Sequence, residues 1–327
     1  MFPRFLSMFF GIACSVIICS TAWAQTPPAD SFNRYILRAV KHLQSTYPSK
    51  GYDINRAYSH KIAYNGDSIN PTNPPRTMCV AAVAEAIIYA IKFYVEETGD
   101  KSVYEFLPAS TWNSMRPRDL RSHIWVDGRL DAYGTADALV TFGIGKRVRF
   151  SELTPGSFLN INRNRPGKKP TGHAVIFLAY LDAKGNELTT YSDAAVGFKY
   201  WSAQGNGTTG DSGYAYRYAF LNKLPNQTGY CPQLPGGKKV DCWILNSKSS
   251  KYLNMGYMLH PSKWNRAVRD ENLELIKRGL YEQTRSRSPL GIPELDPEIS
   301  YADFDAYLEE NDTMKLNEIF PDDASTE

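Results

Sequence analysis

The 327-residue chain has little net charge and no obvious metal-binding pattern, and each scarcity excludes a class of protein. Lys and Arg number 37 against 34 for Asp and Glu, which leaves a formal net charge of +3, and no basic stripe marks a nucleic-acid-binding surface. No His, Cys or carboxylate cluster has the regular spacing of metal ligands. A hydrophobic content of 43% excludes a wholly disordered chain. We therefore expect a folded protein with no metal, no cofactor and no nucleic-acid partner.

Long apolar runs are also scarce, and the one that stands out lies at the N-terminus. Arg4 precedes the apolar stretch 5–19, and Ala22-Trp23-Ala24 fits the small-x-small pattern for cleavage. Residues 1–24 are therefore predicted to be a secretory signal peptide. The run is short for a membrane-spanning helix, and no second run follows. We expect an exported chain, periplasmic or secreted, without stable membrane insertion after cleavage.

Only three of the five cysteines lie beyond this segment. Cys231 and Cys242 flank a turn-rich loop, and an exported protein folds in an oxidising compartment, so a disulfide between them is expected. Cys79 is then left as an unpaired thiol. Such a thiol is at risk of oxidation in an exported protein, so it is either buried and inert or has a function.

The order of the expected elements indicates an α+β fold. Helices are predicted over 30–44 and 78–98, and the second is apolar on nearly every side, which is typical of a helix inside a domain. From about residue 147 the pattern changes to short consecutive strands joined by turns, which favours an antiparallel sheet over a parallel one.

The same change of pattern suggests how the chain is divided. After the signal peptide we expect a catalytic domain over 25–245 and a helical, acidic extension over 246–327. The tail from residue 294 onward carries many acidic residues. A solvated helical extension fits this composition, and a segment that binds a protein partner is the alternative.

Cys79 has the position of a reactive thiol. With Thr77 as the cap, Cys79 lies in the first turn of the apolar helix, where unpaired N–H groups and the helix dipole favour a negative charge. This placement lowers the pKa of a thiol. The same N–H groups could stabilise the oxyanion that forms when a thiolate attacks a carbonyl. A thiolate nucleophile also needs a base, usually a histidine.

His173 is the best candidate for that base among the five histidines. It opens the apolar strand 174–178, so its ring would be held rigidly and yet could face a cleft. The other four lie on an amphipathic helix, in irregular segments or in the C-terminal extension: His42, His60, His123 and His260.

A third polar group should orient the imidazole. A hairpin turn centred near Lys184 would place residue 173 opposite residue 195, with Asp193 diagonally across on the same face. Gln204 and Ser202 on the following strand are the alternatives, because a one-residue bulge would turn Asp193 to the other face.

Two segments of the chain resemble NlpC-type cell-wall peptidases. Tyr64-Asn65-Gly66, followed after a loop by Cys79 at the start of an apolar helix, is similar to their Tyr-Gly-Gly…Asp-Cys-Ser-Gly opening. Residues 153–158 and 172–178 resemble the Leu-x-Pro-Gly-Asp…Gly-His-Val-x-Ile-Tyr-Leu segment that these enzymes share with CHAP amidases. The resemblance covers roughly residues 60–205.

This resemblance implies a papain-like fold, with the cysteine-bearing helix packed on an antiparallel sheet, and hydrolysis of amide or peptide bonds in peptidoglycan. The peptide stems of the wall would be the partner. Cys79 carries over as the nucleophile, His173 as the base, and Tyr64 as a residue that assists the oxyanion or the substrate. The chain departs from the family pattern at Met78, at Val80-Ala81 and at Ser157, and its segment between Cys79 and Pro155 is longer.

Two other functions fit the same residues. A transglutaminase-like periplasmic cysteine protease that acts on protein would use Cys79, His173 and Asp193 equally well. An inactive papain-fold module that binds the cell wall would keep the fold without turnover. New peptide ends on wall fragments would distinguish the wall hydrolase from both.

Overall fold

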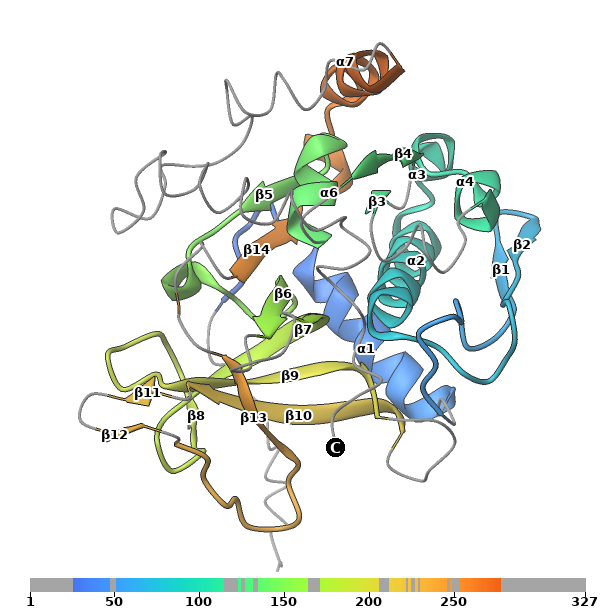
Figure 1. The fold of residues 1–327 in the computed structure, drawn as a ribbon. Coiled ribbons are helices and arrows are strands. Elements are labelled where there is room, and N and C mark those ends of the chain that lie inside the picture. Colours follow the sequence, from blue (N-terminus) through green and yellow to red (C-terminus); the bar gives the residue numbers. More distant parts are fainter. Residues whose placement is uncertain are drawn as a thin grey trace, which may run out of the picture.

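Helices and a mixed sheet make up the protein, which confirms the α+β class expected from the sequence (Figure 1). The predicted signal peptide and the acidic tail beyond residue 277 lie outside the described residues. Within the described part of the chain, no helix is both long and apolar enough to cross a membrane. The computed structural model describes residues 26–47, 51–114, 123–124, 127–131, 135–163, 171–205, 212–221, 223–224, 227–228, 230–245, 248 and 253–277.

An eight-stranded sheet lies at the centre. Its strand order is β13-β10-β9-β7-β6-β14-β5, and β8 pairs with β7 off this path. All of these pairs are antiparallel except β10 with β13, which are parallel. The strands are β5 (Gly145–Arg147), β6 (Phe158–Arg163), β7 (Thr171–Leu181), β8 (Glu187–Leu188), β9 (Gly197–Gln204), β10 (Gly213–Leu221), β13 (Val240–Leu245) and β14 (Leu253–Met258).

Shorter elements surround this sheet. Three separate two-stranded ribbons are formed by β1 (Ile62–Tyr64) with β2 (Asp67–Ile69), β3 (His123–Ile124) with β4 (Asp127–Asp131), and β11 (Lys223–Leu224) with β12 (Gln227–Thr228). The helices are α1 (Asn33–Thr46), α2 (Cys79–Thr98), α3 (Ser102–Phe106), α4 (Ala109–Ser114), α6 (Thr135–Thr141) and α7 (Arg266–Lys277), with 3₁₀ turns η1 (Phe150–Glu152) and η2 (Pro261–Lys263).

Helix α2 is the long apolar helix that the sequence predicts. Gly99 ends it in the left-handed conformation (φ 75°), and its N–H bonds the Val95 carbonyl (2.8 Å), as expected for a C-terminal glycine. α2 packs against α1 on one side and against β7 and β9 on the other (Figure 1). Burial on both sides explains why the helix carries apolar residues around nearly its whole circumference.

Strand β7 separates two cores. Ala174 and Ile176 belong to the core that the sheet shares with α1 and α2. Val175 and Phe177 belong to a second core, together with Tyr200 of β9. Because successive side chains of a strand point to opposite faces, the α2 face of β7 carries the even-numbered residues in this stretch.

The last strand of the sheet comes from a segment that the sequence assigns to the C-terminal extension. β14 lies between β6 and β5, with Gly256 opposite both Phe158 and Arg147. The boundary expected at residue 245 therefore does not coincide with the end of the sheet. Beyond β14, the predicted helical character is present in α7.

Candidate functional site

Cys79 is the first residue of α2 and is fully buried (0% exposed). It is a reduced cysteine. Thr77 does not cap the helix as expected: the N-cap residue is Met78, whose side chain makes no capping bond. The first turn of α2 therefore keeps its N–H groups free of a capping side chain, and the helix dipole favours a thiolate there.

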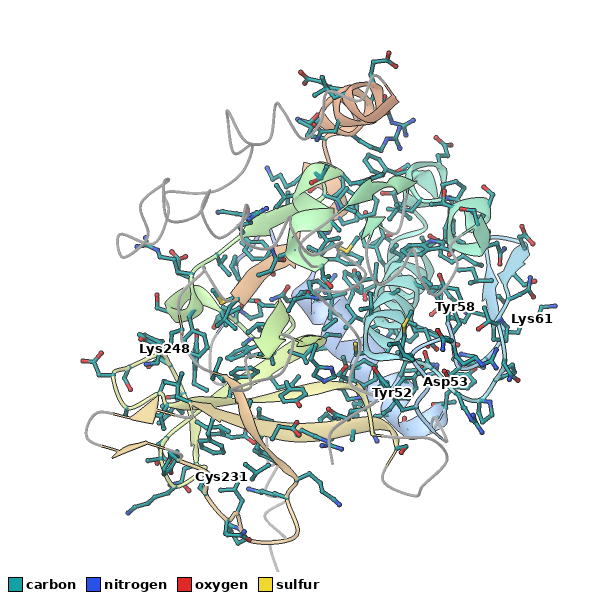
Figure 2. All side chains as sticks on the ribbon, in the orientation of Figure 1. Tyr52, Asp53, Tyr58, Lys61, Cys231 and Lys248 are labelled. Atoms are coloured by element: carbon teal, nitrogen blue, oxygen red, sulfur yellow. The ribbon has the colours of Figure 1, made fainter. Side chains whose placement is uncertain are left out.

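Tyr52, and not Tyr64, is the tyrosine at the thiol. The Tyr52 hydroxyl lies 3.9 Å from Cys79 Sγ, and its segment runs beside the start of α2 through a parallel bridge to Thr77 (Figure 2). Tyr64 is buried in β1, where its hydroxyl donates to the Leu107 carbonyl (2.8 Å). Tyr52 therefore contacts the thiol where the resemblance points to Tyr64, and only its place in a tyrosine-rich loop could have suggested it.

The strand register brings Gln204 to His173. Residue 173 is expected opposite residue 195, but β8 pairs with only the last two residues of β7, β6 occupies the rest of that edge, and β9 pairs along the other edge. In the β7–β9 register Ile176 lies opposite Trp201, so His173 lies opposite Gln204. The expected pairing of residues 173 and 195 is therefore wrong, and one of the two alternatives contacts the imidazole.

Asp193 lies at the far end of β7. Val196 N donates to the Leu181 carbonyl (2.9 Å), and Leu181 is eight residues, or about 26 Å, along the strand from His173. The three residues from Val196 back to Asp193 span at most about 10 Å. Asp193 is exposed and too distant for close charge coupling with the imidazole.

Gln204 decides which nitrogen of His173 carries the proton. The Gln204 amide nitrogen donates to the Ala215 carbonyl (3.3 Å), so its oxygen Oε1 is the atom 3.2 Å from His173 Nε2. An amide oxygen only accepts, so Nε2 of the neutral ring is protonated and Nδ1 is the basic nitrogen. His173 itself is buried (1% exposed), so this tautomer is held by the fold.

Further polar side chains surround Gln204 on the sheet. The Tyr200 hydroxyl lies 3.2 Å from Gln204 Oε1 and also donates to the Asp241 carboxylate. Asp241 is paired with Arg217 (2.8 Å). Ser202, the other alternative to Asp193, donates to a backbone carbonyl of β7 (2.7 Å) and thereby supports the strand pairing.

Cys79 and His173 approach one end of the sheet from different faces. α2 packs on the even-numbered face of β7, whereas His173 alternates onto the face of Val175 and Tyr200. The N–H of Gly51, the residue before Tyr52, donates to the Ser212 carbonyl (3.1 Å). The residue after Ser212 is Gly213 of β10, which pairs with Gln204. A reaction between thiol and imidazole therefore requires the two side chains to meet at this end of the sheet.

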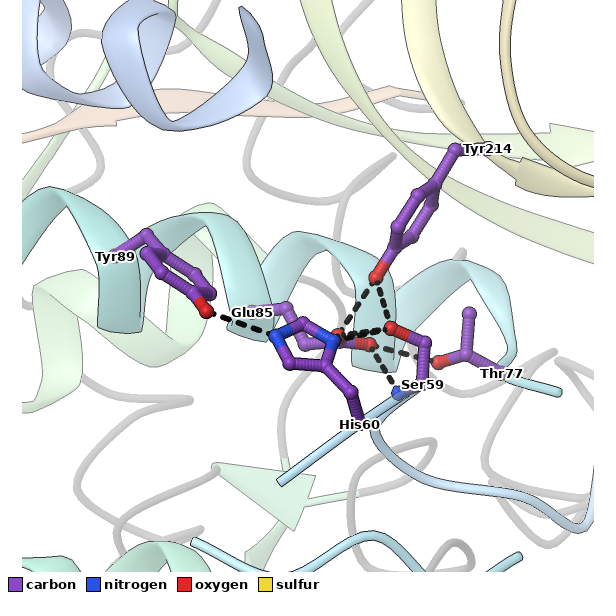
Figure 3. Close-up of polar contacts among 6 residues, drawn as sticks. All are labelled: Ser59, His60, Thr77, Glu85, Tyr89 and Tyr214. Carbon is purple, nitrogen blue, oxygen red and sulfur yellow. Dashed lines mark hydrogen bonds and ion pairs between the residues drawn. The ribbon is translucent and has the colours of Figure 1, made fainter. Parts of the chain in front are cut away.

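A second polar cluster, which the sequence analysis missed, surrounds Glu85 of α2 (Figure 3). Glu85 is fully buried and accepts four hydrogen bonds: from Ser59 N (3.1 Å), Ser59 Oγ (2.8 Å), Thr77 Oγ1 (3.0 Å) and Tyr214 Oη (2.6 Å). Burial raises the pKa of Glu85, and the bonds from Tyr214, Ser59 and Thr77 oppose this. A single carboxylate amid the apolar residues of the first half of α2 is the available signal.

His60 closes the outer side of this cluster. Its ring stacks on Tyr47 (centroids 3.7 Å apart) and bonds the Tyr89 hydroxyl (2.8 Å) through Nε2 and Ser59 Oγ (2.8 Å) through Nδ1. Burial, aided by His42 and Lys92, lowers the pKa of His60 to about 4. The ring is therefore neutral at pH 7, and its approach to Glu85 is not an ion pair under those conditions.

This shift predicts a loss of stability in mild acid. A lowered pKa means that the contribution of His60 is present above pH 6.5 and is lost as the pH falls through about 4. Between pH 7 and pH 4 the wild type should lose up to about 3 kcal/mol more unfolding free energy than His60→Gln. Urea unfolding of both proteins at several pH values measures this. Equal pH slopes for wild type and His60→Gln would contradict it.

The structure describes the side chain of only one of the two cysteines in the predicted disulfide. Cys231 is disulfide-bonded, whereas the side chain of Cys242 lies outside the described residues. The pairing of these two cysteines stays a prediction.

Known proteins add no further constraint on the site. Comparison with protein-family models, with curated proteins and with solved structures finds no match to this chain. Among the residues that the structure describes, no group of three or more His, Cys, Asp or Glu side chains could hold a metal ion. The chemistry is therefore argued from the side chains alone.

Proposed function

We propose that the protein is an exported cysteine hydrolase with a papain-like core that cuts amide or peptide bonds in peptidoglycan. The observation that carries the proposal is the reduced Cys79 at the first position of a buried helix. His173 supports it, because Gln204 holds that ring in the tautomer whose Nδ1 can accept a proton. The choice of peptidoglycan rests on the resemblance of residues 60–205 to NlpC-type and CHAP enzymes.

In this proposal Cys79 attacks and His173 moves the proton. Where the two side chains meet at this end of the sheet, His173 Nδ1 takes the thiol proton, and the thiolate Sγ bonds to the carbonyl carbon of the substrate. The oxyanion that forms is stabilised by the first-turn N–H groups of α2 and by the Tyr52 hydroxyl. The imidazolium then protonates the leaving amine, which gives a thioester and a free amine. Water, deprotonated by His173, hydrolyses the thioester and restores the thiol.

The third position can be tested by a pair of variants. Gln204→Ala should lower turnover by roughly 10- to 100-fold, because His173 loses the acceptor that fixes its tautomer. Asp193→Asn should leave turnover unchanged, since Asp193 is exposed at the other end of β7. Steady-state rates of both purified variants measure this. The opposite ranking would return Asp193 to the site.

A non-catalytic module that binds the cell wall is the second candidate. It is favoured by the full burial of Cys79 and by the placement of His173 on the opposite face of β7. In such a module the thiol would be a packed core residue and His173 a part of the polar interior of the second core. Binding to the wall without turnover is what this candidate predicts.

Mass spectrometry of peptidoglycan digests tests the proposal. The mature protein is incubated with purified sacculi, and the soluble fragments are searched for new peptide ends, with Cys79→Ala protein as the control. New ends that depend on Cys79 support the proposal. Retention on sacculi without new ends favours the binding module. Cleavage of denatured protein in place of sacculi favours the transglutaminase-like protease.

A further inference from the structure

The Glu85 cluster contacts the segment that leads into the start of α2. Thr77, whose hydroxyl donates to Glu85 Oε1 (3.0 Å), is only two residues before Cys79. Thr77 also forms the parallel bridge to Tyr52, and its carbonyl accepts from Asp53 N (3.2 Å). The short segment that Glu85 holds therefore carries the thiol and aligns the hydroxyl that contacts it.

The other oxygen of the same carboxylate reaches the sheet. Tyr214 of β10 donates to Glu85 Oε2 (2.6 Å). In the β9–β10 register Tyr214 lies opposite Ala203, and the preceding residue lies opposite Gln204. Gln204 is the side chain that binds His173. One buried carboxylate thus connects the segment before Cys79 to the strands that orient the histidine.

The cluster is also fully enclosed, so it cannot itself bind a substrate. Glu85 and Thr77 are 0% exposed, and Ser59 is 5% exposed. Both oxygens of Glu85 have two donors each, which fills the acceptor sites of a carboxylate. Such a satisfied buried network is rigid and transmits a change in one member to the others.

We propose that Glu85 is a positioning residue that fixes Cys79 relative to the strands carrying Gln204 and His173, through Thr77 on one side and Tyr214 on the other. The inference rests on the proposed function, since it concerns the geometry of that nucleophile. Thr77→Val removes the hydroxyl that Glu85 binds while keeping the shape of the side chain, and it changes no charge. Thr77→Ser keeps the hydroxyl and is the matched control. Tyr214→Phe removes the bond on the sheet side.

The test is the pH dependence of Cys79 alkylation by iodoacetamide in the full mature chain, with the cysteine pair 231 and 242 oxidised. This readout needs no substrate. In the wild type we expect a midpoint below the usual thiol pKa of about 8.5. In Thr77→Val and Tyr214→Phe the midpoint should rise by about one pH unit, which lowers the alkylation rate about tenfold at pH values below the wild-type midpoint. Thr77→Ser should behave as the wild type.

The outcomes separate this inference from the proposed function. A wild-type midpoint near 8.5 that His173→Ala does not change would overturn the proposed function and the inference with it. A low wild-type midpoint that both Thr77→Val and Tyr214→Phe leave unchanged would overturn the inference alone. In that case a fall in melting temperature would assign the cluster a purely structural role, because packing loss changes stability without moving the midpoint.

Discussion

Replacement of Cys79 by alanine is expected to abolish hydrolysis and to leave the fold intact. Sγ forms the covalent bond to the substrate, so its loss removes the thioester route and should lower turnover at least about 10⁴-fold. The lost atom is small and fully buried, so the free energy of unfolding should fall by only about 1 kcal/mol. Release of peptide ends from sacculi measures turnover, and urea unfolding measures stability.

A matched control separates the role of Cys79 from that of cysteine in general. Replacing Cys231 and Cys242 together by serine leaves α2 untouched and should retain turnover at a temperature where the protein stays folded. Turnover of the Cys79→Ala protein within tenfold of the wild type would end the cysteine-hydrolase proposal. Such retained turnover would also exclude the wall-binding module, which predicts none, and would place the reacting group elsewhere in the chain.

Replacement of His173 by alanine is expected to have the second largest effect, a loss of about 10²- to 10⁴-fold in turnover. The base and nucleophile act as a unit, so this variant combined with Cys79→Ala should cost little more than Cys79→Ala alone. Loss of the ring also removes one of the two groups that contact the Gln204 oxygen, the other being the Tyr200 hydroxyl, which should cost about 1 kcal/mol of stability. Single-turnover rates and urea unfolding measure the two effects separately.

Two other histidines provide the controls for this variant. His42→Gln and His60→Gln alter rings that pack around Tyr89 on α2, away from the start of β7. His42→Gln should keep turnover within a few-fold of the wild type at pH 7, whereas His60→Gln also removes a bond to Ser59 and tests the Glu85 cluster. A loss for His60→Gln as large as that for His173→Ala would move the search for the base to the Glu85 cluster.

Local patterns in the sequence are enough to predict α2 and the apolar strand that contains His173. A continuous apolar run and a terminal glycine define a helix by short-range effects, so α2 was predicted to within one residue at its start. Thr77 was misassigned because the usual capping bond competes here with a buried carboxylate. That choice depends on burial, which a capping pattern does not contain.

The register error at Asp193 has a long-range cause. The turn near Lys184 is present, but β8 leaves β7 after two residue pairs because β6 occupies the rest of that edge, and β9 pairs along the opposite edge. The length of a hairpin depends on which other strand pairs with the same edge of its first strand, and this is decided by packing across the sheet. The same limit applies to Tyr52, since motif spacing cannot tell which tyrosine of a loop folds back on a helix.

Because β14 lies near the end of the described residues, the sheet can be completed only late in the synthesis of the chain. β6 and β5 have β14 as their common neighbour, and Phe158 pairs with Gly256 across nearly a hundred intervening residues. A nascent chain that still lacks residues 253–258 therefore has two strands with unfilled hydrogen-bonding edges, which are templates for association. Pairing over such sequence distances is also slow to form. The polypeptide should thus stay unfolded, and open to chaperones, until almost all of its described part has been synthesised.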